Sequence, residues 1–188
     1  MEKEKSYTMS TLALVGGINV NTLRTLMARD RSPLPVAGED VDTRLWSRHD
    51  ALDAIRLSVA GRLAGKQGLI EKGMDWKDAS TFCFAGGVNT AIYDALAAFA
   101  AADPATRMTG NENDIWAAYA HMPDGLGNPE GGQGFNGTLA HVTAKLVNKE
   151  FHPRDDLCKH LCSIILINIS EVCRETFQRA EAAGIAFP

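Results

Sequence analysis

Apolar residues recur at helical spacing in two short stretches near the start of the chain, and polar residues fill the positions between them. In the first stretch, Leu12 and Ala13 form an apolar face that is small enough for a second helix to cross closely. Thr8 or Ser10 is suited to cap the start of this helix, and Gly17 is suited to supply the left-handed or tight backbone of a turn after it. The pattern therefore predicts a short helix that ends in a turn of a few residues.

The second stretch predicts a helix with one apolar and one polar face. Asn19 is a good N-cap, and Ile18 beside it is placed to pack as a hydrophobic staple. The expected buried stripe consists of four residues, the last of them less central: Val20, Leu23, Met27 and Leu26. The expected exposed face carries Asn21, Thr22, Arg24, Thr25 and Arg29. Hydrogen-bonding and cationic side chains on an exposed helix are suited to reading the major groove of DNA.

A third helix is predicted after a proline-bounded interruption. Residues 33–35 read Pro-Leu-Pro, which blocks continuation of the second helix, and residues 36–42 are expected to form the tip of a hairpin. Residues 47–50 have the form of a capping box, and Asp50 suits the positive end of a helix. This helix is expected to run to about Ala64 and to be broken by Gly65 and Gly68, with an inward face of Leu52, Ile55, Val59 and Leu63.

Residues 7–79 resemble the DNA-binding domain of MerR-type regulators and of related winged-helix proteins of phages. The motif positions are Tyr7-Thr8, Leu12-Ala13, Gly17-Ile18-Asn19 and Thr22-Leu23-Arg24, then Arg44-Leu45-Trp46-Ser47 with Asp50. Residues 73–79 are similar to the short helix that packs behind the wing in that family. The resemblance implies that Arg24 meets the DNA backbone or a base, and that Arg44 holds a phosphate from the wing.

The chain also departs from that family. Residues 25–29 lack the tyrosine pair that is typical of effector-sensing members, and no long heptad helix follows to form their antiparallel dimer. Because the similarity covers under half of the chain, it implies the DNA-binding module and leaves the regulatory half unidentified.

The distribution of charge supports a nucleic-acid partner only weakly. The net charge is −4, but residues 1–72 hold eleven lysines and arginines against nine acidic residues, whereas the remainder holds eight against fourteen. The positive residues cluster at the motif positions Arg24, Arg29, Arg31, Arg44 and Arg48. A balance of +2 is small for a module that gains non-specific affinity by neutralising phosphates. Two copies on one DNA site, or a partner protein, are therefore expected.

The second half of the chain gives a coarser pattern. A helix is expected over 89–102, where Asp103-Pro104 stops it, followed by a polar loop over 105–114 and an exposed mobile loop over 123–137. A buried strand is expected over 163–169. Ser170 is then expected to cap a closing helix that runs to about Glu181 and stops at Gly184. The loop over 123–137 contains six glycines and two prolines. Residues 115–122 fit either a helix or a strand, and residues 138–147 are equally ambiguous.

Other chemistry is weakly supported. Cys158 and Cys162 share a helical face, but a zinc site needs four ligands and no second cysteine pair has a finger spacing, so both are expected in a core. The glycines of 131–137 lack the lysine and Ser/Thr of a phosphate-binding loop, and none of the five histidines stands in a hydrolase signature. No catalytic residue, metal or cofactor is predicted.

These observations predict a cytoplasmic, bacterial or phage α+β protein. The sequence opens without a charged-then-apolar leader, and its longest nearly apolar run, residues 95–102, is far short of a membrane span. Residues 1–80 are expected to form a winged helix-turn-helix domain. Residues 81–188 are expected to form a mainly helical oligomerisation or regulatory domain with a short buried strand and the Gly-rich loop at 123–137.

The predicted function is that of a sequence-specific DNA-binding transcriptional regulator that acts as a dimer on double-stranded DNA. The predicted DNA contacts are Asn21, Thr22, Arg24, Thr25, Arg29, Arg44 and Arg48. The strand over 163–169 and the apolar residues Val172, Cys173 and Phe177 are expected to supply the dimer interface, and the C-terminal half is also a possible surface for a protein partner. The alternative is an architectural DNA-binding protein that resembles phage small terminase subunits or excisionases.

Overall fold

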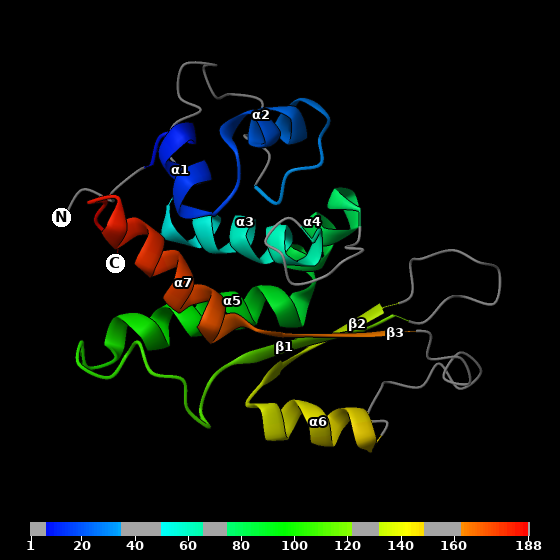
Figure 1. Ribbon diagram of the computed structural model, residues 1–188. Coiled ribbons are helices and arrows are strands. Elements are labelled where there is room, and N and C mark those ends of the chain that lie inside the picture. Colours follow the sequence, from blue (N-terminus) through cyan, green and yellow to red (C-terminus); the bar gives the residue numbers. More distant parts are fainter. Residues whose placement is uncertain (1–6, 35–49, 66–74, 122–131, 149–162, 188) are drawn as a thin grey trace. The chain divides into compact units, whose positions relative to one another are not determined.

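The computed structural model describes residues 7–34, 50–65, 75–121, 132–148 and 163–187. Within these residues it contains seven helices and a three-stranded antiparallel sheet, so the predicted α+β class is confirmed (Figure 1). The chain divides into two compact units. We call Met1–Phe84 together with Val172–Pro188 the N-terminal unit, and Ala85–Glu171 the sheet unit.

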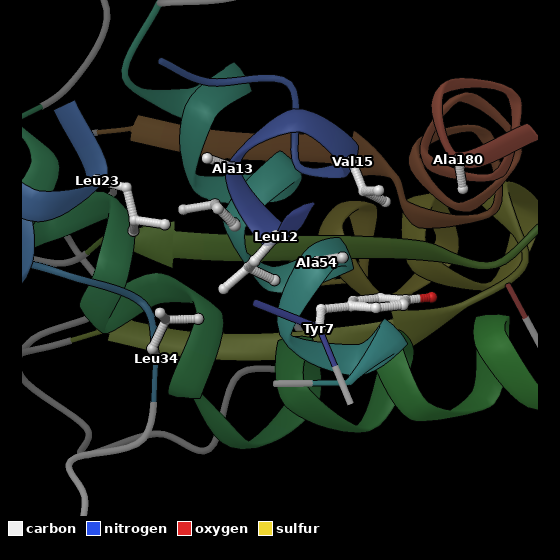
Figure 2. Packing of buried hydrophobic residues seen from close by; sticks show 9 residues of the cluster. Tyr7, Leu12, Ala13, Val15, Leu23, Leu34, Ala54 and Ala180 are labelled. Carbon is white, nitrogen blue, oxygen red and sulfur yellow. The ribbon is translucent and has the colours of Figure 1, made fainter. Parts of the chain in front are cut away.

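The regular elements among the described residues of the N-terminal unit are all helices. This unit contains α1 (Met9–Val15), α2 (Val20–Ala28), α3 (Ala51–Leu63), α4 (Trp76–Phe84), and α7 (Ile169–Ala182) from Val172 onward. One cluster of buried residues joins α1, α2, α3 and α7, and Figure 2 shows most of its members converging: Tyr7, Leu12, Ala13, Val15, Leu23, Leu34, Ala54, Leu57 and Ala180. Ile185 and Phe187 pack against the same cluster.

The C-terminal segment therefore differs from the expected division of the chain near residue 80. Residues 172–188 belong to the N-terminal unit because Ala180, Ile185 and Phe187 complete its apolar core. The buried Tyr7 also donates a hydrogen bond from its hydroxyl to the carbonyl oxygen of Ala186, at 3.0 Å. Burial, together with the nearby Asp50 carboxylate, raises the pKa of Tyr7, so this hydroxyl keeps its proton at neutral pH.

The turn between α1 and α2 follows the sequence closely. Of the two residues predicted as possible caps, it is Thr8 that caps α1, and its hydroxyl accepts from the backbone N–H of Thr11. Gly17 has φ +73°, and the backbone N–H groups of Gly17 and Ile18 bond the carbonyl oxygens of Leu14 and Ala13. This pair of bonds is a Schellman motif, which needs a left-handed residue at the position of the glycine. A side chain on the preceding Gly16 would meet Leu57 of α3 at 2.7 Å, so the start of the turn lies tightly against α3.

The second helix ends at Ala28, several residues before Pro33, the first residue predicted to block its continuation. Asp30 has φ +52°, and the N–H groups of Asp30 and Arg31 bond the carbonyl oxygens of Met27 and Leu26. The same Schellman geometry thus stops α2 after Ala28, with an aspartate in the position that glycine usually takes. The sequence pattern did not predict this stop because aspartate is a less frequent occupant of that conformation.

The third helix ends where predicted, but Asp50 is its N-cap rather than the last residue of a capping box that begins at Ser47, and its buried surface is wider than the predicted single inward face. Asp50 caps α3 by accepting from the N–H of Asp53, and Gly65 has φ +71° just after its end. All α3 residues except Arg62 are buried, including Asp53 and Arg56, whose side chains form an ion pair at 3.2 Å. The expected apolar stripe of Leu52, Ile55, Val59 and Leu63 is therefore only part of the buried surface of α3.

The sheet unit contains α5 (Gly86–Ala101), β1 (Trp116–His121), β2 (Gly132–Gly137), α6 (Leu139–Val147) and β3 (Ser163–Asn168). The strand order is β2-β1-β3, with both pairs antiparallel, and Ala118 of β1 lies between Phe135 and Leu166. Phe135 and Ala118 pack with Val142 of α6, whereas the neighbouring Gly134 faces Gly87 of α5. Successive strand residues point to opposite faces, so α5 and α6 cover opposite faces of the sheet (Figure 1).

The sheet corrects the expected loop over 123–137. Residues 132–137 form β2, although the sequence Gly-Gln-Gly-Phe-Asn-Gly has poor strand propensity. The close approach of α5 to β2 explains the glycine at 87, because a Cβ there would lie 2.6 Å from the carbonyl of Gly134; a Cβ on Gly134 itself would lie 3.3 Å from the Gly87 nitrogen. The ambiguous stretches are settled as a strand over 116–121 and a helix over 139–147, which Thr138 caps.

The last strand and helix differ from expectation in two details. β3 is an edge strand rather than a fully buried one: Ile167 is buried, but Ile164 and Leu166 are 43% and 42% exposed. Ser170 does not cap α7; the Asn168 side chain accepts from the N–H of Glu171, and the Ser170 hydroxyl accepts from the N–H of Ile115. Gly184, with φ +65°, follows the end of α7 as predicted.

Of the helices that the structure describes, none alone has the length and apolar composition to cross a membrane; only the interrupted pair α4 and α5, taken together, reaches that composition.

Candidate nucleic-acid interface

The candidate interface is the exposed face of α2. Leu23 and Leu26 are buried, while Val20 and Met27 are only partly buried, so Leu26 is more central to the packed side than the sequence pattern indicated. Asn21, Arg24, Thr25 and Arg29 are exposed, and Thr22 is partly exposed. The structure therefore places four of the five predicted residues on α2 and the fifth, Arg29, at its C-cap, and it leaves all but Thr22 open to solvent.

The two arginines stand on opposite flanks of this face. At 3.6 residues per turn, Arg24 lies about 60° to one side of Asn21 and Arg29 about 80° to the other. Asn21, Thr25 and Ala28 form the strip between them, and the helix rises about 12 Å from Asn21 to Arg29. A major groove is about 12 Å wide, so a helix with cations on both flanks suits a groove walled by two phosphate backbones.

Hydrogen bonds fix the polar groups at the start of this face. The Asn19 carbonyl Oδ1 accepts from the N–H of Asn21 at 2.8 Å and caps the helix. The Arg24 Nη1 group donates to Oδ1 of Asn21 at 3.4 Å, and the Thr25 hydroxyl donates to the carbonyl oxygen of Asn21 at 2.9 Å. Because its hydrogen is used within the helix, the Thr25 hydroxyl presents acceptor lone pairs outward.

The charges around α2 favour an anionic partner. The helix carries no acidic residue between its Asn19 cap and Arg29, and its N-terminus adds the positive end of the helix dipole. Two acidic residues temper this at the other end: Asp30 follows Arg29, and Asp75 pairs with Arg31 at 3.6 Å. Both members of that ion pair are about half exposed, so the pair contributes little to stability.

The position of the turn depends on a residue that the sequence pattern did not single out, Arg179 of α7. Its Nε donates to the carbonyl oxygen of Val15 at 2.8 Å, which is the last residue of α1. Its Nη2 donates to the hydroxyls of Ser58 at 2.6 Å and Thr176 at 3.2 Å, and its Nη1 lies 3.6 Å from Glu175. Arg179 thus connects α1, α3 and α7 directly behind the turn that carries α2.

Electrostatics explains why an arginine suits this position. Burial lowers the pKa of Arg179, and the adjacent Glu175 carboxylate raises it again. The guanidinium remains charged at neutral pH, because arginine titrates far above it, and so complements the negative C-terminus of α1. Glu175 also pairs with Arg62 of α3. The only local sign in the sequence was a basic residue in the last turn of a predicted helix.

Two of the predicted DNA contacts lie outside the described residues. Arg44 and Arg48 belong to the segment 35–49, as does Trp46, so the predicted wing stays a prediction. Cys158 and Cys162 likewise fall outside the described ranges.

The described residues show little other chemistry. No group of three or more His, Cys, Asp or Glu side chains within them is placed to hold a metal ion. Cys83 and Cys173 are free and buried, and burial raises the pKa of each thiol to about 12. Neither thiol is therefore a nucleophile at neutral pH, since the thiolate is the reactive form.

Comparison with known proteins gives no further guide: no protein-family model matches the sequence, and no curated protein matches it either.

Proposed function

We propose that the protein is a sequence-specific DNA-binding transcriptional regulator that acts in the cytoplasm on double-stranded DNA. The observation that carries this proposal is the pair α1 and α2, joined by a tight turn, with the polar face of α2 open to solvent. In a helix-turn-helix the second helix enters the major groove while the first crosses the backbone. The resemblance of residues 7–79 to MerR-type domains supports the same role.

We assign a role in DNA contact to each of the predicted residues at α2 from its position around the helix. Asn21 and Thr25 lie on the central strip and would meet base edges, whereas the partly exposed Thr22 lies on the flank next to Arg29. Arg24 and Arg29 stand on the flanks and would contact the phosphates of the two strands. Arg44 and Arg48 would add phosphate contacts from the wing. On this assignment the flanking arginines supply affinity, and the central residues supply sequence preference.

The assignment is tested by selecting binding sites from random duplexes with the full-length protein, followed by titration of the selected site. We expect Arg24→Ala/Arg29→Ala to weaken binding to selected and unrelated duplexes alike, and to reduce the slope of log affinity against log salt by about two. Asn21→Ala should instead change which site is preferred, at about 1–3 kcal/mol per lost bidentate base contact.

Lys77→Ala/Arg107→Ala is the matched control, because it also removes two positive charges, one from α4 and one from the turn that follows α5. Its affinity should fall much less than that of the α2 variant. Equal losses in the two double variants would contradict the assignment. Tight binding without any selected sequence would favour the architectural alternative, a protein resembling small terminase subunits or excisionases.

A further inference from the structure

We propose that two copies of this chain associate by pairing their β3 strands antiparallel across a two-fold axis, which joins their sheets into one six-stranded sheet. This inference deepens the proposed function and rests on it in one respect, since a two-half-site DNA target requires two copies. Its structural basis is separate and lies entirely in the sheet unit.

The first observation is the open edge of β3. The strand order β2-β1-β3 places β3 at one border of the sheet, and among the described residues β3 pairs with β1 alone. Ser163–Asn168 reads Ser-Ile-Ile-Leu-Ile-Asn, with no charge, proline or glycine. Natural edge strands that remain unpaired usually carry lysine, proline or a bulge. Within Ser163–Asn168 the strand therefore carries none of these barriers to pairing.

The second observation is a pair of exposed apolar side chains, Ile164 and Leu166, on one face of this strand. Leu166 lies beside Ala118, on the face that α6 covers over β1 and β2. Ile164 points to the same face by the alternation of the strand. Both side chains are more than 40% exposed, whereas Ile167 on the opposite face is buried. This exposed pair is confined to the strand whose backbone edge is open.

The occupant is a second copy because the edge is complementary to itself. In one continuous antiparallel sheet, two residues that lie opposite each other on neighbouring strands point their side chains to the same face. Even-numbered residues of one β3 must therefore lie opposite even-numbered residues of the other. Centring the axis on Ile165 opposes Ile164 to Leu166 of the second copy, and Leu166 to its Ile164. All four exposed side chains then form cross-strand apolar pairs, which stabilise antiparallel ladders. An uncharged edge offers nothing to select an oppositely charged partner.

Sedimentation equilibrium of the full chain without DNA tests the association independently of DNA binding. Wild-type protein at micromolar concentration should have twice the 20.3 kDa mass of the chain, and Ile164→Lys/Leu166→Lys should have the single mass. Leu14→Lys/Val147→Lys is the matched control, since it replaces two other exposed apolar residues and should remain dimeric. A monomeric wild type, or a dimeric β3 variant with the circular dichroism of the wild type, would overturn the inference.

Cysteine cross-linking tests the register. In a Cys158→Ser/Cys162→Ser background, Ile164→Cys/Leu166→Cys should oxidise to a covalent dimer, because opposed Cβ atoms lie about 5 Å apart. Either single cysteine should give no such product, and a product from one of them would refute the axis at Ile165. A dimer that selects no DNA sequence would leave this inference standing and remove the proposed function instead. Conversely, sequence-specific binding by a monomer would keep the function and reject the inference.

Discussion

Replacement of Arg179 tests whether α7 is an integral part of the helical unit that presents α2. Arg179→Met keeps the length and the apolar stem of the side chain but removes the bonds to Val15, Ser58 and Thr176 and the ion pair with Glu175. The carbonyl oxygen of Val15 and the hydroxyl of Ser58 then lose their charged donor. A hydrogen bond to a charged group contributes about 1.5–3 kcal/mol, and a buried group left unsatisfied costs about 1–3 kcal/mol.

The terms overlap, so we expect the free energy of unfolding to fall by about 2–4 kcal/mol. Urea unfolding followed by circular dichroism measures this loss, and hydrogen exchange should locate it in α1, α3 and α7. Arg107→Met is the matched control, because Arg107 lies over the Phe99 ring at 5.1 Å and its loss should cost about 0.5–1 kcal/mol. A loss below about 1 kcal/mol for Arg179→Met would refute the connecting role of this side chain.

The coupling to Ser58 gives a sharper check of the same idea. The double variant Arg179→Met/Ser58→Ala should cost less than the sum of the two single variants, because both remove the same 2.6 Å bond. Additive effects would show that this bond contributes nothing. The role of α7 also predicts that deletion of residues 172–188 unfolds the N-terminal unit, since the deletion removes Ala180 and Arg179 together.

Two backbone predictions accompany this one. Asp30→Gly should stabilise the protein by about 0.5–1 kcal/mol, because glycine adopts the left-handed φ of +52° without strain and the change removes a negative charge from the C-terminus of α2. A lower melting temperature for this variant would contradict the prediction. Gly87→Ala should destabilise the protein by about 1–3 kcal/mol, because its Cβ would lie 2.6 Å from the Gly134 backbone. Gly86→Ala is the control and should not destabilise the protein, because a Cβ at Gly86 has no neighbouring atom within 4 Å. Equal melting temperatures for the two alanine variants would reject the close approach of α5 to β2.

The sequence by itself determined the local structure around the candidate interface. The caps at Thr8 and Asn19, and the left-handed Gly17, each depend on hydrogen bonds between residues no more than five apart. Such bonds are specified by the identities of neighbouring residues, so the sequence predicted these helix starts and this turn. The polar face of α2 followed from the same helical period.

Only the tertiary structure decided the sheet and the place of α7. The glycine-rich residues 132–137 have little strand propensity of their own, and they form a strand because β1 pairs with them and Gly87 of α5 approaches them closely. Leu26 is more buried than Val20 or Met27 because packing, not spacing, sets which part of an apolar stripe faces the core. Arg179 reaches Val15 across 164 positions of sequence, and no local pattern specifies a contact of that range. These features depend on which distant segments meet, and that is settled by the packing of the whole unit.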